Sequence, residues 1–284
     1  MKLLDILING EKLLKESSII NSKREAKLII MHVLNINEYE FLTNPEKSIQ
    51  EKEYKKIITL LKKRAKNQPY AYLVKNRYFY DLNFYVNKNV LIPRPETEHI
   101  IENILKKVNK NIPLNIIDLG IGSGAILITL LNHLPKAYGV GIDISHKALK
   151  VSKKNIIKHK LRNRCTLVNG NWAEAIKPNY FDILICNPPY IDKDHIKNVG
   201  IEVKNYEPII ALNGGKFGLE PLRNLLPSAK SCLKNNGLAY FEIGYNQLDS
   251  VKNLLKEEKF KIKNIIKDFS NFERILEVAP IIKK

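Results

Sequence analysis

Strand-like and helix-like segments alternate from Leu114 to the end of the chain, and this alternation limits the possible folds more than any other feature. The expected strands are NIIDLG, YGVGID, CTLVNG, FDILIC and GLAYFEI, and the expected helices cover residues 123–134, 146–160 and 219–233. Such an order indicates βαβ units around a mostly parallel sheet with helices on both faces. Two further segments, KFKIKNIIKD and FERILEVAP, are expected to close the sheet as strands. We therefore predict an α/β domain.

The N-terminal part of the chain has a different pattern. Its first 66 residues read as short amphipathic helices, and Ser22 and Glu25 have the S-x-x-E spacing of a capping box, which predicts a helix start there. The aromatic-rich stretches YAYLV and RYFYDLNFYV then favour extended structure and a hairpin connector. We predict a small N-terminal helical domain over 1–68, a hairpin linker over 69–95 and the α/β domain over 96–284.

Composition narrows the class of protein. The 284 residues are 44% hydrophobic, enough to bury a sizeable core. Apolar segments stay far below the roughly 20 residues of a membrane span, and the N-terminus lacks a secretory h-region, so we expect a cytoplasmic protein without a membrane partner. The three cysteines are scattered, which fits core thiols in a reducing compartment. The six histidines show no ligand spacing, so no metal is expected.

The net charge of +18 raises the possibility of a nucleic-acid partner, because basic residues neutralise phosphates. However, only 8 of the 47 basic residues are arginine, the residue best suited to reading base edges. The charge is also spread over both parts of the chain. We therefore expect no specific nucleic-acid partner, although weak attraction to a ribosome or another polyanion stays open.

The stretch DLGIGSGA follows the first expected strand of the α/β domain. Its glycines allow a sharp turn and a close approach to a ligand ahead of a helix N-terminus. The alternative is an ordinary glycine-rich turn between a strand and a helix. The candidate cofactor-binding residues of this loop are Gly120, Ile121, Gly122, Ser123 and Gly124.

Asp143 ends the next expected strand, 19 residues beyond Gly124. This is near the spacing at which an acidic residue accepts hydrogen bonds from a ribose, although the same carboxylate could cap the following helix. The loop and Asp143 together suit a nucleoside cofactor, with or without a pyrophosphate. After the third strand, Trp172 is placed beside an adenine ring and Asn171 could accept from its amino group; a core role for the tryptophan is the alternative.

The fourth strand, FDILIC, ends in NPPY, whose residues are Asn187, Pro188, Pro189 and Tyr190. An amide or exocyclic amino nitrogen is a poor nucleophile because its lone pair is delocalised. The Asn187 side-chain oxygen and the Pro188 carbonyl can accept its two hydrogens, with Tyr190 stacked on the planar group. These four residues are the candidate catalytic residues, and Asn187 is also a candidate for contact with the cofactor. A strand that merely ends in two prolines is the alternative.

Several motifs together resemble one family. IPRPETE, DLGIGSGAI, FDILICNPPYI, YEPIIALNGGKFGLE and EIGYNQ are similar to the protein glutamine N5-methyltransferases that modify class I peptide chain release factors. The N-terminal stretches REAKLIIMHVL and NQPYAYLV resemble the helical domain and linker of that family, so the likeness runs nearly end to end. Ile121 and Asn171 stand where the family more often has threonine and aspartate.

The resemblance implies a Rossmann-like methyltransferase sheet, S-adenosylmethionine (SAM) as methyl donor, and an enzyme that methylates the glutamine of a Gly-Gly-Gln loop in class I release factors. It also implies that the helical domain recognises the substrate, and we expect a monomer. A glutamine methyltransferase of a large-subunit ribosomal protein shares these motifs and is the second reading. A nucleic-acid amino-methyltransferase, which shares NPPY alone, and a non-catalytic SAM-binding protein are less favoured alternatives.

Overall fold

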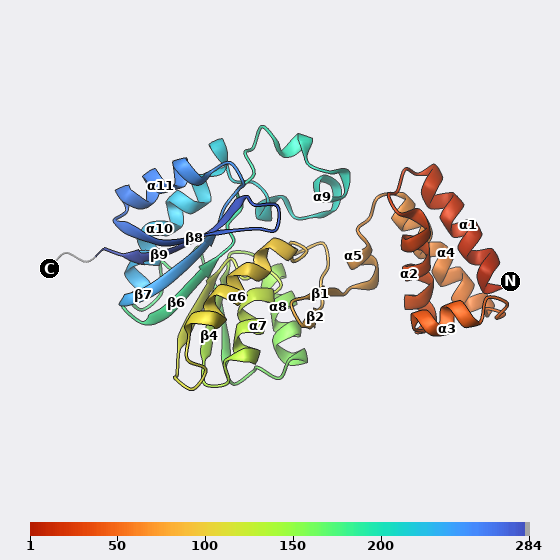
Figure 1. Ribbon diagram of the computed structural model, residues 1–284, viewed down its shortest axis with the longest axis horizontal. Helices are drawn as coiled ribbons and strands as arrows, with labels where there is room; N and C mark the ends of the chain where they lie inside the picture. The colour runs from red at the N-terminus through yellow and green to blue at the C-terminus, as the bar shows by residue number, and fades with distance from the viewer. Residues whose placement is uncertain (282–284) are drawn as a thin grey trace. The chain divides into compact units, whose positions relative to one another are not determined.

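The computed structural model describes residues 1–281 and divides into two compact units (Figure 1). The first unit comprises residues 1–76 together with the separate segment 200–206. The second comprises residues 77–199 and the chain from 207 onward.

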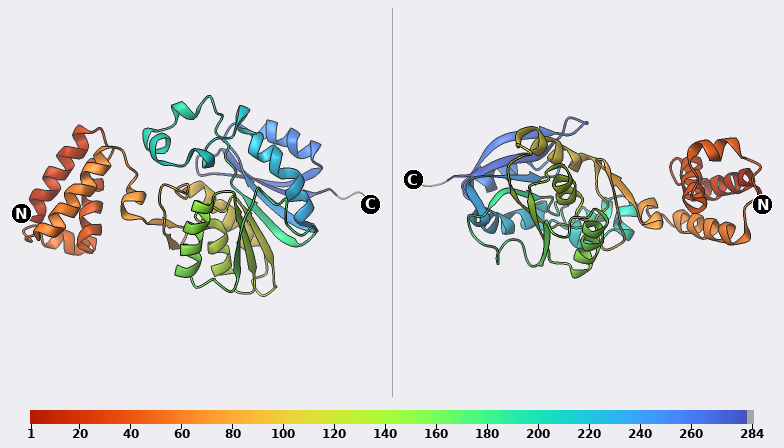
Figure 2. Two further views of the ribbon diagram at one scale, coloured as in Figure 1. Left: turned by 180° about the vertical axis from the view of Figure 1, so that it is seen from behind. Right: turned by 90° about the horizontal axis from the view of Figure 1, so that it is seen from below.

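The first unit is helical. Its helices are α1 (Leu3–Glu16), α2 (Ser22–Leu34), α3 (Glu38–Thr43), α4 (Glu51–Ala65), α5 (Tyr70–Val74) and α9 (Ile201–Tyr206). Helices α1, α2 and α4 pack on one another (Figure 2). Leucine and isoleucine side chains dominate the buried core of this unit. The side chain of Arg64 is buried and donates to Glu25 of α2 at 2.9 Å and to Glu202 of α9 at 2.6 Å. The Tyr206 hydroxyl donates to the Lys66 carbonyl at 2.7 Å, so α9 is fastened to this unit at both of its ends.

Two expectations for this region are wrong in detail. Helix α2 begins at Ser22, but Asn21 is its N-cap in a left-handed conformation and makes no capping hydrogen bond. A capping box occurs instead at α3, where Asn37 and Glu40 exchange hydrogen bonds of 2.9 Å. The stretch YAYLV forms the short helix α5 rather than an extended segment. Burial of Ala71, Tyr72 and Leu73 outweighs the preference of aromatic residues for strands.

The second unit is built on a seven-stranded sheet in the order β5-β4-β3-β6-β7-β9-β8. Its strands are β3 (Asn115–Leu119), β4 (Tyr138–Asp143), β5 (Cys165–Asn169), β6 (Phe181–Cys186), β7 (Leu233–Glu242), β8 (Phe260–Lys267) and β9 (Glu273–Pro280). Strands β3 to β7 run parallel to one another, whereas β9 runs antiparallel between β7 and β8. This confirms the predicted α/β fold with a mostly parallel sheet and two closing strands.

Helices cover both faces of the sheet (Figure 1). Helices α6 (Glu98–Lys107), α7 (Ala125–His133) and α8 (His146–Lys158) lie on one face, and α10 (Glu220–Cys232) and α11 (Leu248–Glu257) lie on the other. Short 3-10 helices are η1 (Pro95–Thr97), η2 (Ile196–Asn198), η3 (Ile209–Ala211) and η4 (Lys216–Gly218). The predicted helix over 123–134 starts two residues later than expected, because the glycine loop continues to Gly124. The predicted hairpin is present as β1 (Arg77–Phe79) and β2 (Leu82–Phe84).

Strand β6 lies in the middle of the sheet, and its buried side chains explain why an uninterrupted apolar run predicted it correctly. Strand β8 forms an outer edge and carries lysine at positions 261, 263 and 267. The three cysteines are buried free thiols. Among the helices of residues 1–281, none combines the length and the apolar character that crossing a membrane requires.

Candidate active site

A cavity of about 370 Å³ lies at the carboxyl ends of β3, β4 and β6, where ligands of open α/β sheets bind. The predicted site residues that line it are Gly120, Ile121, Gly122, Ser123, Asp143, Asn171, Trp172, Asn187, Pro188 and Pro189. Two others, Gly124 and Tyr190, lie next to these stretches but do not line the cavity. Four segments that are far apart in the chain thus meet around one space.

The glycine loop needs its glycines for backbone conformation. Gly120, Gly122 and Gly124 have φ of +79°, +54° and +82°, the left-handed region that other residues avoid. Two side chains of helix α8 hold the loop by hydrogen bonds. Ser152 donates to the Gly122 carbonyl at 2.7 Å, and the fully buried Asn155 donates to the Ser123 carbonyl at 2.8 Å. The loop is therefore held by side chains while its other side faces the cavity.

Asp143 connects this loop to the start of α8. Its two carboxylate oxygens accept from the Gly122 N–H and the Ser145 N–H, both at 2.9 Å. The cap of α8 is Ser145, which accepts from Ala148 N at 3.2 Å, so the capping alternative for Asp143 is wrong. Burial raises the pKa of the Asp143 carboxyl, while the two backbone hydrogen bonds lower it. Contact of Asp143 with a ribose stays a prediction.

A second carboxyl group, Asp118 at the end of β3, also lines the cavity. Burial, followed by the charge of Asp143, raises the pKa of Asp118 from 3.8 to about 7. Burial thus raises the pKa of both carboxyl groups at this edge of the sheet. Asp118 is not among the site residues predicted from the sequence.

Asn171 and Trp172 follow β5. Trp172 packs partly against the core, as the alternative reading expects, and it also lines the cavity. Its place beside an adenine ring stays a prediction. Asn171 donates from Nδ2 to Glu174 Oε1 at 2.8 Å. This contact does not use its amide oxygen, and the acceptor role of Asn171 toward an adenine stays a prediction.

Asn187 and Tyr190 point to different surroundings. Asn187 lines the cavity and donates from Nδ2 to Thr97 Oγ1 at 3.3 Å. The Tyr190 hydroxyl accepts from Arg274 at 3.0 Å and lies 3.5 Å from Glu242 Oε1, and the Arg274 guanidinium sits 5.3 Å from the centre of its ring. Burial, with the charge of Glu242, raises the pKa of Tyr190 to about 12. The hydroxyl thus stays protonated, and stacking of this ring on a substrate stays a prediction.

Several other residues near the site belong to the motifs that resemble the family, but no role for them is predicted from the sequence. From EIGYNQ, Glu242 accepts from Thr97 at 2.6 Å, and Gln247 donates to the carbonyls of Tyr190 at 3.0 Å and Gly218 at 3.0 Å. From IPRPETE and YEP, Arg94 donates to the buried Glu207 at 2.6 Å. These contacts join residues about 30 to 145 positions apart in the chain, which spacing within a motif does not reveal.

No group of three or more histidine, cysteine, aspartate or glutamate side chains within residues 1–281 is arranged to hold a metal ion. Among the polar groups that line the described cavity are several hydrogen-bond acceptors, including the Asn187 amide oxygen, the Pro188 carbonyl and the carboxyl groups of Asp118 and Asp143.

Comparisons with known proteins agree with this architecture. The family model of the PrmC N-terminal domain matches residues 5–74, and that of the methyltransferase small domain matches residues 97–203. Among solved structures, the Pyrococcus horikoshii protein PH0793 superposes with a TM-score of 0.50 over 72% of this chain and 70% of that chain. Its sequence identity is 12%, so this likeness concerns the fold alone.

Two relatives are similar over almost the whole chain. The bifunctional methyltransferase of Rickettsia bellii is 36% identical over 97% of this chain and 54% of its own length, so the chain spans about half of that relative. The release factor glutamine methyltransferase of Clostridium botulinum is 36% identical over 98% of this chain and 99% of its own length. On this similarity, over both the helical unit and the cavity-bearing unit, the chain belongs to the release factor glutamine methyltransferase family.

Proposed function

We propose that this protein transfers a methyl group from SAM to the side-chain amide nitrogen of the glutamine in the Gly-Gly-Gln motif of class I release factors. One observation carries the proposal: Asn187 lies at the carboxyl end of β6, lines the cavity together with the glycine loop, and donates from its Nδ2 to Thr97 Oγ1. Its amide oxygen is then the acceptor available to a planar amide in the cavity.

SAM is the methyl donor, and the residues of the cavity fit it. Asp143 offers a carboxylate for ribose hydroxyls, Trp172 offers an aromatic surface for the adenine, and the loop of Gly120 and Gly122 allows close approach of the backbone. The volume of about 370 Å³ lies in the range of small-molecule sites. When bound, SAM supplies an electrophilic methyl group carried on a positively charged sulfur.

The protein's own contribution to the reaction is orientation. The Asn187 Oδ1 and the Pro188 carbonyl accept the two N–H hydrogens of the glutamine amide, which fixes the plane of the amide and the direction of its lone pair. Two stiff prolines hold these acceptors, because their φ angles are fixed. Each preorganised contact of this kind contributes on the order of 100-fold in rate. With the amide held in this way, its nitrogen would exchange one N–H proton, released to water, for the methyl group, and S-adenosylhomocysteine would remain.

The helical unit, predicted as residues 1–68, positions the protein substrate. The 69–95 segment links this unit to the methyltransferase domain over 96–284. The enzyme acts as a monomer in the cytoplasm. The match of a separate N-terminal domain model to residues 5–74 supports treating this part as a module of its own.

The deciding experiment incubates the protein with methyl-labelled SAM and, separately, a class I release factor, large-subunit ribosomal proteins, and nucleic acid. Label should appear in the release factor, and mass spectrometry should map it to the Gly-Gly-Gln glutamine. A release factor in which that glutamine is replaced by glutamate is the matched control and should stay unlabelled. Label only in ribosomal protein or nucleic acid would replace the proposed substrate.

A further inference from the structure

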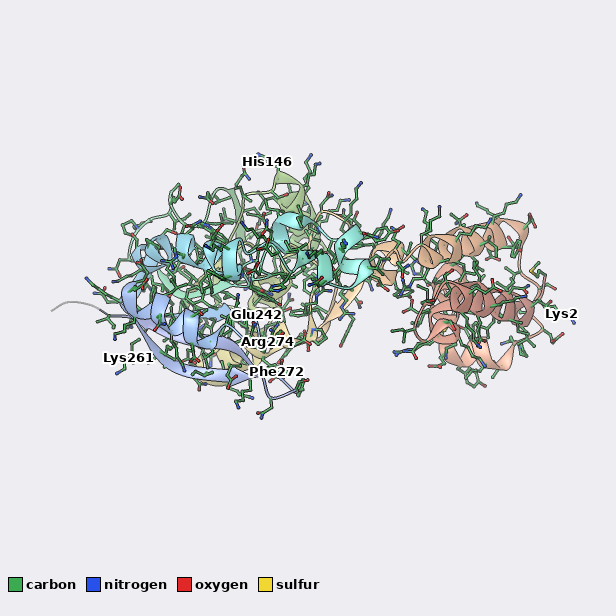
Figure 3. All side chains as sticks on the ribbon, turned by 90° about the horizontal axis from the view of Figure 1, so that it is seen from above. Lys2, His146, Glu242, Lys261, Phe272 and Arg274 are labelled. Carbon is green, nitrogen blue, oxygen red and sulfur yellow. The ribbon has the colours of Figure 1, made fainter. Side chains whose placement is uncertain are left out.

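Glu242 is a buried carboxylate that the proposed reaction does not use. It is the last residue of β7, and 1% of its surface is exposed. Polar side chains lie near both of its carboxylate oxygens. Thr97 Oγ1 lies 2.6 Å from one carboxylate oxygen, and the Tyr190 hydroxyl and the Arg274 guanidinium lie 3.5 Å and 3.7 Å from the other. Figure 3 shows Glu242 and Arg274 as neighbours. Burial of a carboxylate is unfavourable unless it is paired, so the cluster needs a reason.

The direction of the hydrogen bonds gives that reason. Thr97, 4% exposed in η1, has one hydroxyl hydrogen, and the short contact with the Glu242 carboxylate uses it. Its oxygen can then only accept from Asn187, so the Asn187 amino group is the half that faces Thr97. The other half of the amide, Oδ1, is left for the cavity.

The hydrogen bond from Thr97 to Glu242 maintains this direction, and it requires the carboxylate form of Glu242. Burial raises the pKa of the Glu242 carboxyl above its ordinary value; the hydrogen bond from Thr97, the charge of Arg274 and a hydrogen bond from Asn187 partly offset this effect, and nearby Glu96 adds to it. A protonated Glu242 could donate to Thr97 instead. The Thr97 hydroxyl would then be free to donate to Asn187, which would favour the flipped amide with its amino group toward the cavity.

Resting on the proposed function, we infer that Thr97 and Glu242 are positioning residues that hold the Asn187 amide with its oxygen toward the substrate. Thr97 also lines the cavity, whereas Glu242 does not, and in this role both act through Asn187. They select one of two amide orientations that have nearly the same shape but opposite hydrogen-bonding character, since an amino group facing the substrate would repel the N–H hydrogens that Asn187 must accept.

The test compares Thr97→Val, which keeps the shape but removes the hydroxyl, with Thr97→Ser, which keeps the hydroxyl. Thr129→Val is the matched control, because Thr129 is also buried but its hydroxyl donates at 2.7 Å to the Ala125 carbonyl within α7. The turnover number of Thr97→Val should fall about tenfold, the scale of one lost hydrogen bond. The KM for the release factor and the affinity for SAM should change little, and Thr97→Ser and Thr129→Val should keep the wild-type turnover number.

A second measurement does not depend on activity. In protein with nitrogen-15 in its asparagine side chains, the Asn187 amide signals are identified by their loss in Asn187→Asp. Thr97→Val should shift these signals and speed the exchange of their hydrogens with solvent, whereas Thr97→Ser should preserve them.

Unchanged Asn187 signals in Thr97→Val would overturn the inference, as would an undiminished turnover number in that variant when the wild-type enzyme is active. A wild-type protein that leaves every release factor unmethylated would instead refute the proposed function. The amide signals would then still decide whether Thr97 orients Asn187.

Discussion

Asn187 has an accepting and a donating half, and only the accepting half is proposed to meet the substrate. Asn187→Ala removes both, so we expect the single-turnover methylation rate to fall at least ~100-fold while SAM binding falls less. Asn187→Asp keeps an oxygen but adds a charge near Glu242, and its rate should lie between those of alanine and wild type.

The matched control is Asn132→Ala, because Asn132 donates to the Ile128 carbonyl within α7 and does not line the cavity. It should methylate at the wild-type rate. If Asn187→Ala did so too, with its folding intact, NPPY would have no part in the chemistry.

Asp118 predicts a pH dependence of stability. Its pKa is raised from 3.8 to about 7 in the folded state, so between these values the unfolded chain has released the proton that the folded chain keeps. Its contribution to stability therefore falls as pH rises through this window. Asp118→Asn removes the effect, and its free energy of unfolding relative to wild type should rise by up to ~1.4 kcal/mol per pH unit.

Urea unfolding without cofactor at several values from pH 4 to pH 7 measures this difference. Asp249→Asn is the matched control for the loss of an aspartate, because the Asp249 side chain is 94% exposed. A free energy difference for Asp118→Asn that did not change with pH would contradict the raised pKa of the buried carboxyl.

In the glycine loop between β3 and α7, two glycines resist substitution for different reasons: one because of its backbone conformation, the other because of the space beside its Cα. At Gly122, φ is +54° and an added Cβ would meet nothing closer than 3.8 Å, whereas at Gly124 it would lie 2.7 Å from Ile128 Cδ1. A β-branched residue in the left-handed region costs about 1–2 kcal/mol or more. We expect Gly122→Val to fold but to bind SAM at least about tenfold more weakly, since the loop must shift.

Calorimetry gives the affinity, and thermal unfolding checks the fold. Gly200→Ala is the control, because Gly200 has no atom within 4 Å of an added Cβ and is not at positive φ. Gly124→Ala should instead lower thermal stability through the contact with Ile128. Full SAM affinity in folded Gly122→Val would remove the loop from the cofactor site.

The elements differ in how far the sequence predicts them. Strand β6 matched its predicted bounds, because a continuous apolar run is what burial on both faces requires. The helix α5 was missed because tertiary packing outweighed local preference. For the site, strand ends predicted which loops meet, since parallel strands bring their carboxyl ends to one edge. The pairing of Thr97 with Glu242 could not be predicted, because only the fold brings residues 145 positions apart into contact.

At the scale of the whole chain, the division into two units predicts that cofactor binding and recognition of the protein substrate can be separated. A chain starting at residue 77 keeps every residue that lines the cavity, so it should bind SAM nearly as well as the full protein. It should lose most of its methylation of a folded release factor, because the proposed substrate-positioning unit is gone. Methylation of a short Gly-Gly-Gln peptide, which needs no such unit, should be equally slow for both chains.

Calorimetry with SAM confirms that the shortened chain is folded, and labelled methyl transfer gives the rates. Equal rates on the folded release factor would remove the helical unit from substrate recognition. Were nucleic acid the substrate, binding would instead weaken steeply with added salt, according to the number of phosphates neutralised.

The lysines at positions 261, 263 and 267 on the edge strand β8 bear on the protein's behaviour in concentrated solution. An open strand edge can pair with the same strand of another molecule, which is how ordered aggregates begin. Here such pairing would bring two rows of lysines together, so repulsion between their positive charges opposes self-assembly through β8. Because salt screens that repulsion, storage at high ionic strength should weaken the protection while leaving each molecule folded.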